Sequence, residues 1–180
     1  MFETIKNFFR KRRLNKVASK RPTGLLALEK ISSANFLIDA AEPGFDLLKE
    51  DILTWCRKNN IKCNIYFLDL RKLNKDEMVL TSIQTTILRK ELDWLGYPNE
   101  PTTRGLIEEE SDLFISLIND FYPAVDYTSK CANARFKIGR NSYPDHVYDM
   151  IFSGCQNEDL RSDAREIFKA MTEFISKIQQ

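Results

Sequence analysis

Polar side chains follow several apolar runs of this sequence, at points where the strands of a parallel sheet would end. Asp39 follows Phe36-Leu37-Ile38, and Asp69 follows Tyr66-Phe67-Leu68. In open parallel sheets, ligands bind beyond the carboxyl ends of the strands. The residues predicted to line such a crevice are Asp39, Asp69, Asn119, Asp120, Tyr122, Arg140 and Ser153. Aspartates gathered there could hold Mg²⁺, which prefers oxygen ligands and keeps several waters.

Strand-end aspartates also have a plainer use, as caps and turn residues, and we favour that interpretation. The turn at 40–44 is a poor phosphate site, because a phosphate needs glycines and free backbone N–H groups at a helix start. Pro43 has no N–H, and Glu42 would repel an anion. No P-loop occurs in the sequence. We therefore predict no cofactor and no metal ion.

Nucleophilic catalysis has little support in the residue pattern. His146 is the only histidine, and no Gly-x-Ser-x-Gly motif accompanies it. Cys155 is followed by Glu158 and Asp159, whereas a reactive thiol needs a cation nearby. No Cys-x-x-Cys pair occurs, which favours reduced and mostly buried thiols in a cytoplasmic protein. The four cysteines are Cys56, Cys63, Cys131 and Cys155. We predict no catalytic residue.

A second kind of chemistry comes from the distribution of charge. The first 21 residues hold eight of the 27 basic side chains and one of the 26 acidic ones, so this arm carries +7 and the remaining chain −6. Such an asymmetry predicts that the arm meets an anionic surface. The residues predicted to do so are Lys6, Arg10, Lys11, Arg12, Arg13 and Lys16.

Residues 2–17 have helical periodicity, with Phe2, Ile5, Phe8 and Phe9 on one side. Three interpretations stay open. The helix could pack its phenylalanines on the rest of the protein, lie at an anionic membrane surface, or contact RNA phosphates. The Arg-Pro-Thr-Gly stretch at 21–24 breaks the helix. We therefore expect an arm at 1–21 and one domain at 25–180.

Alternating strand and helix patterns position these residues. At 180 residues and 21.0 kDa the chain suits one domain with a continuous core. The predicted strands cover 35–39, 63–69, 112–117, 134–138 and 148–153. The predicted helices cover 45–56, 123–131 and a stretch from Leu160 that Asn157 would cap. This order predicts an α/β fold: a single doubly wound, mostly parallel sheet with helices on both faces, preceded by the basic helix.

Residues 70–108 are the hardest to interpret. Thr85 to Arg89 could form an edge strand, since Thr-Thr-Ile-Leu is β-prone. The same residues could continue a helix from Asp76, with Leu80 and Ile83 on one face.

Four segments together resemble a family of small uncharacterised Rossmann-like α/β proteins common in Bacteroidetes. These segments are Phe36-Leu37-Ile38-Asp39, the KELDWLGYP stretch at 90–98, the DLFISL stretch at 112–117 and the KCANARFKIG stretch at 130–139. The resemblance covers most of the 25–180 domain, favours a strand at Thr85 to Arg89, and implies no particular activity. Residues 112–139 are also similar to the amino-terminal half of heptosyltransferase-type glycosyltransferases. Those enzymes bind the nucleotide-sugar mainly in a second domain that 180 residues cannot supply, so we do not expect the activity.

Together these patterns predict a non-catalytic, cytoplasmic α/β binding domain. Its basic arm would attach it to RNA or to the inner membrane surface, and a protein partner is also open. No apolar run approaches the ~18 residues that span a bilayer. The alternative is a small sugar- or nucleotide-handling enzyme that uses the strand-end crevice.

Overall fold

The computed structural model describes residues 2–72, 81–143, 146–152 and 163–178. Within these ranges, six parallel strands form one sheet in the order β3-β2-β1-β4-β5-β6. The strands are β1 (Ser33–Asp39), β2 (Lys62–Asp69), β3 (Thr86–Leu88), β4 (Ser111–Ser116), β5 (Ala134–Gly139) and β6 (Met150–Ile151). The helices are α1 (Phe2–Val17), α2 (Phe45–Lys58), α3 (Glu100–Glu108), α4 (Pro123–Cys131) and α5 (Ala164–Ser176).

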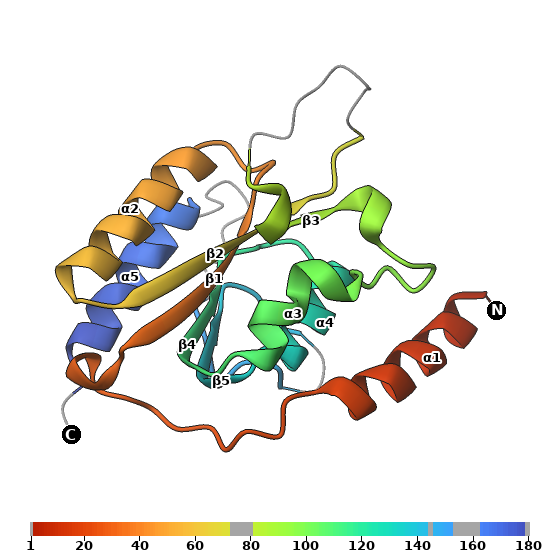
Figure 1. Ribbon diagram of the computed structural model, residues 1–180, viewed down its shortest axis with the longest axis horizontal. Helices are drawn as coiled ribbons and strands as arrows, with labels where there is room; N and C mark the ends of the chain where they lie inside the picture. The colour runs from red at the N-terminus through yellow and green to blue at the C-terminus, as the bar shows by residue number, and fades with distance from the viewer. Residues whose placement is uncertain (1, 73–80, 144–145, 153–162, 179–180) are drawn as a thin grey trace.

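Helices cover both faces of the sheet (Figure 1). Side chains of β1 alternate between the two faces, as the period of a strand requires. Phe36 and Ile38 pack in the core beneath α2 and α5, whereas Leu37 packs in the core beneath α3 and α4. This strand order is that of a doubly wound Rossmann-type sheet, in which the order reverses between β1 and β4. The predicted α/β class is confirmed.

The ambiguous stretch contains a strand and a helix. β3 confirms the strand predicted near Thr85 to Arg89, and the helix alternative is wrong for Thr86–Leu88. α3 was not predicted; it is a nine-residue helix that begins with Glu-Pro and buries Leu106 completely. β6 is shorter than the predicted strand at 148–153, and α5 is capped by the Asp163 side chain. Asn157, Ser153 and Cys155 lie outside the described residues.

Gly139, the last residue of β5, brings the chain close to an aromatic ring. A Cβ atom at this position would lie 2.3 Å from the Tyr148 ring, which is too close for any residue other than glycine unless the ring moves. The Tyr148 hydroxyl is 2.8 Å from the Ser129 hydroxyl on α4. The carboxyl end of β5, which leads directly into Arg140, is therefore held from the α4 side of the sheet.

The arm is a helix, α1, that lies against α4 and against the turn at 93–98 (Figure 1). Arg10 Nε donates to the Leu95 carbonyl oxygen at 2.8 Å. Arg13 forms an ion pair with Asp93, and Leu14 is buried in a small apolar cluster with Tyr97 and Tyr127. Burial alone would lower the pKa of Arg13, but the hydrogen bond and charge of Asp93 outweigh it and raise that pKa.

The docked face of α1 differs from the one that the first of the three interpretations requires. Ile5, Phe8 and Phe9 were candidates for packing on the domain, but all three are exposed. The interpretation that the phenylalanines pack on the domain is therefore wrong for Phe8, whereas Phe9 keeps one edge-to-face contact with Trp94 of the domain. Guanidinium groups do this work because the site on the domain offers a carbonyl oxygen, a carboxylate and two aromatic faces.

Candidate functional site

A cleft of about 360 Å³ lies at the carboxyl ends of β1 and β4, where the strand order reverses. This is the place where doubly wound sheets bind ligands. The cleft is lined by Asp39, Ala41, Glu42, Pro43, Asn119, Asp120, Tyr122 and Arg140. The structure thus brings together five of the seven residues predicted from the sequence: Asp39, Asn119, Asp120, Tyr122 and Arg140.

Asp69 does not line the cleft. It ends β2, is buried, and accepts hydrogen bonds from Arg71 Nε at 2.9 Å and from Arg71 Nη2 at 2.7 Å. The Arg71 hydrogen bonds lower the pKa of Asp69 against the opposing effect of burial. This carboxylate holds the turn after β2, the ordinary role of a strand-end aspartate.

Arg140 and Glu42 form the charged pair of the cleft. Arg140 is buried, and its Nη1 lies 2.9 Å from each carboxylate oxygen of Glu42 and 3.0 Å from the Leu117 carbonyl oxygen. From the sequence, Glu42 was expected only to repel anions. Its partner lies 98 positions away, so only the fold could reveal the pair. Because Glu42 neutralises the charge of Arg140, the other carboxylates of the cleft, Asp39 and Asp120, determine its net charge.

Asp39, the last residue of β1, is one of those carboxylates. It accepts a hydrogen bond from the Ala41 N–H at 2.8 Å. Burial raises its pKa, and the charges of Glu42, Asp120 and Asp69 raise it further against that hydrogen bond. Such a shift marks a group placed where ionisation is unfavourable, which is frequent at binding sites.

Tyr122 and Asp120 form the opposite wall. The Tyr122 hydroxyl donates to Asp120 Oδ2 at 3.3 Å, and burial together with the charge of Asp120 raises the pKa of the phenol. Beside them, the exposed ring of Phe121 stacks on Tyr143 with ring centres 4.9 Å apart. Phe121 was missed by sequence reasoning, although an aromatic residue in a turn at the predicted strand end was a usable signal.

The cleft can accept hydrogen bonds at several carboxylate oxygens and donate from a phenol. This donor and acceptor pattern suits hydroxyl-rich or cationic molecules and opposes phosphate groups. Within the described ranges, no three His, Cys, Asp or Glu residues are grouped so as to hold a metal ion.

A second surface lies on the outward side of α1. Ile5, Phe8 and Phe9 of the helix, together with Trp94 of the turn, form what we name the aromatic face. The exposed fraction of the side chain is 64% for Phe8 and 57% for Trp94. Phe9 contacts both Phe8 and Trp94 edge to face, with ring centres 5.7 Å apart in each pair.

The six arm cations divide between the two sides of α1. Arg10 and Arg13 contact the domain, and Lys6 lies 3.6 Å from Glu3. Lys11, Arg12 and Lys16 are exposed. The positive charge available to an external surface is therefore smaller than the sequence suggested, and Arg12 and Lys16 lie beside the aromatic face.

Comparison with known proteins places this chain in a family. A model of a family of unknown function, DUF6913, matches residues 6–174. The chain belongs to the DUF6913 family. The match begins within α1 and ends within α5, so one family model covers the arm and the sheet. Searches of curated proteins and of solved structures found no match.

Membership in DUF6913 confirms that the family is one of unknown function, and the structure confirms the α/β fold. The occurrence of the family in Bacteroidetes stays a prediction. The likeness of residues 112–139 to glycosyltransferases stays a prediction. In the described part of the chain, no helix is both long and apolar enough to cross a membrane.

Proposed function

We propose that this DUF6913 protein is a cytoplasmic peripheral protein of anionic membrane surfaces, attached through the aromatic face and the cations beside it. The observation that carries the proposal is the exposure of Phe8 and Trp94 next to Arg12 and Lys16. A contiguous cluster of exposed large apolar side chains is unusual unless it meets an apolar partner. Basic residues around such a cluster are typical of helices that lie in the headgroup region.

The energies involved suit reversible attachment. Burying one Phe side chain contributes about 1.5–3 kcal/mol, and each Lys or Arg near an anionic leaflet contributes about 1 kcal/mol. Two inserted rings and two cations therefore supply several kcal/mol. The rest of the chain, with a charge of −6, would be repelled, so the protein would attach by α1 alone.

A lipid surface is favoured over RNA by the geometry of the aromatic face. Single-stranded RNA binds by stacking its bases on flat ring faces. Phe8, Phe9 and Trp94 instead pack edge to face, and Ile5 offers no ring at all. Insertion between acyl chains requires only apolar surface, which these four side chains supply.

The test is flotation of the full chain with vesicles of phosphatidylcholine alone and with 30% phosphatidylglycerol. The double variant Phe8→Ser/Trp94→Ser should bind the anionic vesicles at least about tenfold more weakly, since it loses most of the apolar contribution. Arg12→Gln/Lys16→Gln should weaken binding and reduce its dependence on salt. Arg10 and Arg13 are unchanged in both variants, so α1 stays docked.

Phe121→Ser is the matched control, because Phe121 is another exposed ring, at 55%, beside the crevice rather than on α1. It should bind vesicles as the unaltered chain does. Equal flotation of the Phe8/Trp94 variant and the unaltered chain would overturn the proposal. If the unaltered chain bound single-stranded RNA but no vesicles, and these variants lost the RNA binding, the arm would be an RNA-binding element.

The crevice supports a second candidate function, binding or conversion of a small hydroxyl-rich molecule such as a sugar. What supports it is the convergence of Asp39, Asp120 and Tyr122 on the cleft at the switch point, beside the exposed ring of Phe121. A thermal-shift screen with sugars, amino sugars, sugar phosphates, nucleotides and Mg²⁺ tests it, because a ligand that binds only the folded state raises its stability. The shift should disappear in Asp120→Asn. A screen without any shift would count against the crevice as a binding site.

A further inference from the structure

A second cavity, of about 410 Å³, lies where α1 and the following segment meet the domain. We name it the junction pocket. The charged and titratable side chains of its lining are Lys11, Arg21, Lys130, Lys137, His146 and Asp149. Four of these side chains are Lys or Arg, and Asp149 is the one acid in that lining. The charge of the pocket is thus opposite to that of the crevice.

Lys137 is the buried cation of the junction pocket. Its exposed fraction is 6%, although it carries an ammonium group. Nζ donates to the Ser129 carbonyl oxygen at 2.8 Å and to the Lys130 carbonyl oxygen at 3.2 Å, both in the last turn of α4. These bonds use two of the three N–H groups of the ammonium. Stabilising the carboxyl end of a helix explains the two bonds but not the cavity beside them.

The ammonium is incompletely compensated. Asp149 accepts a hydrogen bond from the Lys137 backbone N–H at 2.8 Å. Burial lowers the pKa of the Lys137 ammonium to about 8, against the smaller opposing effects of Cys131 and Asp149. A buried charge is costly without a hydrogen-bonded counter-ion, so an anion in the pocket would relieve that cost.

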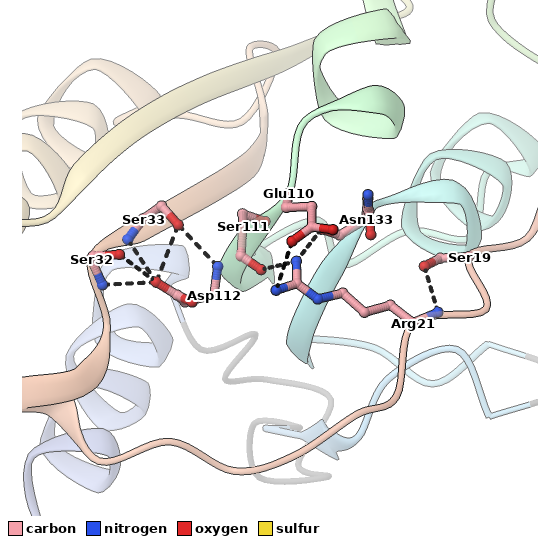
Figure 2. Close-up of polar contacts among 8 residues, drawn as sticks. All are labelled: Ser19, Arg21, Ser32, Ser33, Glu110, Ser111, Asp112 and Asn133. Carbon is pink, nitrogen blue, oxygen red and sulfur yellow. Dashed lines mark hydrogen bonds and ion pairs between the residues drawn. The ribbon is translucent and has the colours of Figure 1, made fainter.

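The other cations of the junction pocket differ in whether they contact protein groups or solvent. The Arg21 guanidinium is directed to Ser111, Asn133 and Glu110 (Figure 2), with Nη1 3.0 Å from the Ser111 carbonyl oxygen. Lys130 lies 3.1 Å from Asp126. Lys11 of α1 and His146 both line the pocket and are exposed. Lys11 and Lys137 therefore face the cavity from the arm and from the sheet respectively.

We propose that the junction pocket binds the phosphate group of a phosphate monoester, with Lys137 and Lys11 as its cationic donors. A cavity of this volume holds a phosphate with a small attached group, since small-molecule sites span about 300–1,000 Å³. Charge-assisted hydrogen bonds from ammonium to phosphate are among the strongest in proteins. A bound phosphate would also connect α1 to β5, so the ligand would clamp the arm on the domain.

This inference does not rest on the membrane proposal. Lys11 is two residues after Phe9, which places it about 200° around the helix, on the flank opposite Trp94. The phosphate could belong to a soluble metabolite or to a lipid headgroup, and the experiment separates these sources.

The experiment measures the melting temperature of the full chain with inorganic phosphate, with glycerol 3-phosphate, and with sodium chloride at equal ionic strength. Phosphate and glycerol 3-phosphate should raise the melting temperature above the chloride value. Lys11→Gln should weaken the apparent affinity for phosphate about tenfold, as expected for the loss of one charge-assisted contact. Lys16→Gln, on the same helix, is the matched control and should change it less than about twofold.

Lys137→Met should abolish the phosphate effect. Should this variant not fold, the Lys137 Nζ signal in an NMR spectrum of the unaltered chain serves instead, and it should shift on titration with phosphate.

An effect with glycerol 3-phosphate identifies a soluble source. An effect of phosphatidic acid vesicles alone, lost in Lys11→Gln but retained in Phe8→Ser/Trp94→Ser, identifies a headgroup. Equal responses to phosphate and chloride without any effect of phosphatidic acid vesicles, or equal losses in Lys11→Gln and Lys16→Gln, would overturn the proposal while leaving vesicle flotation untouched.

Discussion

Two carboxylates on neighbouring strands have opposite surroundings. Asp112 is the second residue of β4, at the amino edge of the sheet, and Asp39 is the last residue of β1, at the carboxyl edge. Asp112 Oδ2 accepts hydrogen bonds from the backbone N–H and the hydroxyl of both Ser32 and Ser33, at 2.7–3.2 Å (Figure 2). Asp39 accepts one from Ala41 and faces other acids.

The pKa shifts follow from these surroundings. Burial alone would raise the pKa of Asp112, but the hydrogen bonds from Ser32 and Ser33 outweigh it and lower that pKa. The pKa of Asp39 is raised. The hydrogen bonds at the amino edge thus stabilise the ionised form of Asp112, whereas the surroundings at the carboxyl edge disfavour the ionised form of Asp39. Groups held at a cost to stability are those for which a binding role should be sought.

Asp112→Asn gives the largest expected effect. Asparagine keeps the size of the side chain but loses the charge that strengthens the hydrogen bonds, so the free energy of unfolding should fall by about 2 kcal/mol at pH 7. The folded-state pKa lies below the unfolded value near 3.9, so the contribution is complete above that value and is lost as the pH falls through the folded pKa. Urea unfolding at pH 7 and at pH 3 measures both effects, and an unchanged stability would remove the contrast between the two edges.

Arg21→Met tests the amino edge at its second polar group, with an expected loss of about 1 kcal/mol. The guanidinium bonds to the Ser111 and Asn133 carbonyl oxygens would be lost, while methionine preserves much of the aliphatic contact. The segment after α1 should also become more sensitive to protease. Lys20→Met is the control, because Lys20 is an exposed neighbour in the same segment. If both variants behaved alike, Arg21 would have no anchoring role.

The parts of the molecule also differ in how well they could be predicted from the sequence. The crevice residues were predictable because apolar runs locate the strand ends, and parallel strands bring those ends to one edge. The pairing of Arg140 with Glu42 was not predictable, because strand order determines which distant turns meet. α3 was missed because nine residues with Pro-Thr-Thr near the start give a weak helical period.

For α1 the helix itself was predicted, but the side chains that dock it on the domain were not. The periodic apolar residues Phe8 and Phe9 suggested the buried face, whereas Arg10, Arg13 and Leu14 form it. Arginine can dock on aromatic rings and carboxylates, so a charge run need not be a solvated face. A usable signal was present in the KELDWLGYP stretch, where an acid and two aromatic residues lie in one turn.

Asp39→Asn should raise stability at neutral pH, by about 0.5 kcal/mol after allowance for solvent screening. The neutral amide can still accept from the Ala41 N–H and no longer repels Glu42 and Asp120. Because the folded-state pKa is raised, the ionised form weakens the fold, so the gain should be present at pH 7 and absent below pH ~4. A gain of stability with loss of ligand response would identify Asp39 as a binding group, whereas a loss of stability would make it structural, like Asp112.

Tyr122→Phe carries the smallest expected effect and the sharpest test of the carboxyl edge. The Tyr122 hydroxyl donates a long hydrogen bond of 3.3 Å to the exposed carboxylate of Asp120, which water can replace. Thermal unfolding should therefore agree with the unaltered chain to within about 0.5 kcal/mol. A ligand of the crevice would lose the phenol, so its thermal shift should decrease in this variant while stability stays constant. A loss above about 1 kcal/mol would mean that the carboxyl edge is held by its polar groups as the amino edge is, and the contrast between Asp39 and Asp112 would then concern single residues rather than the two ends of the sheet.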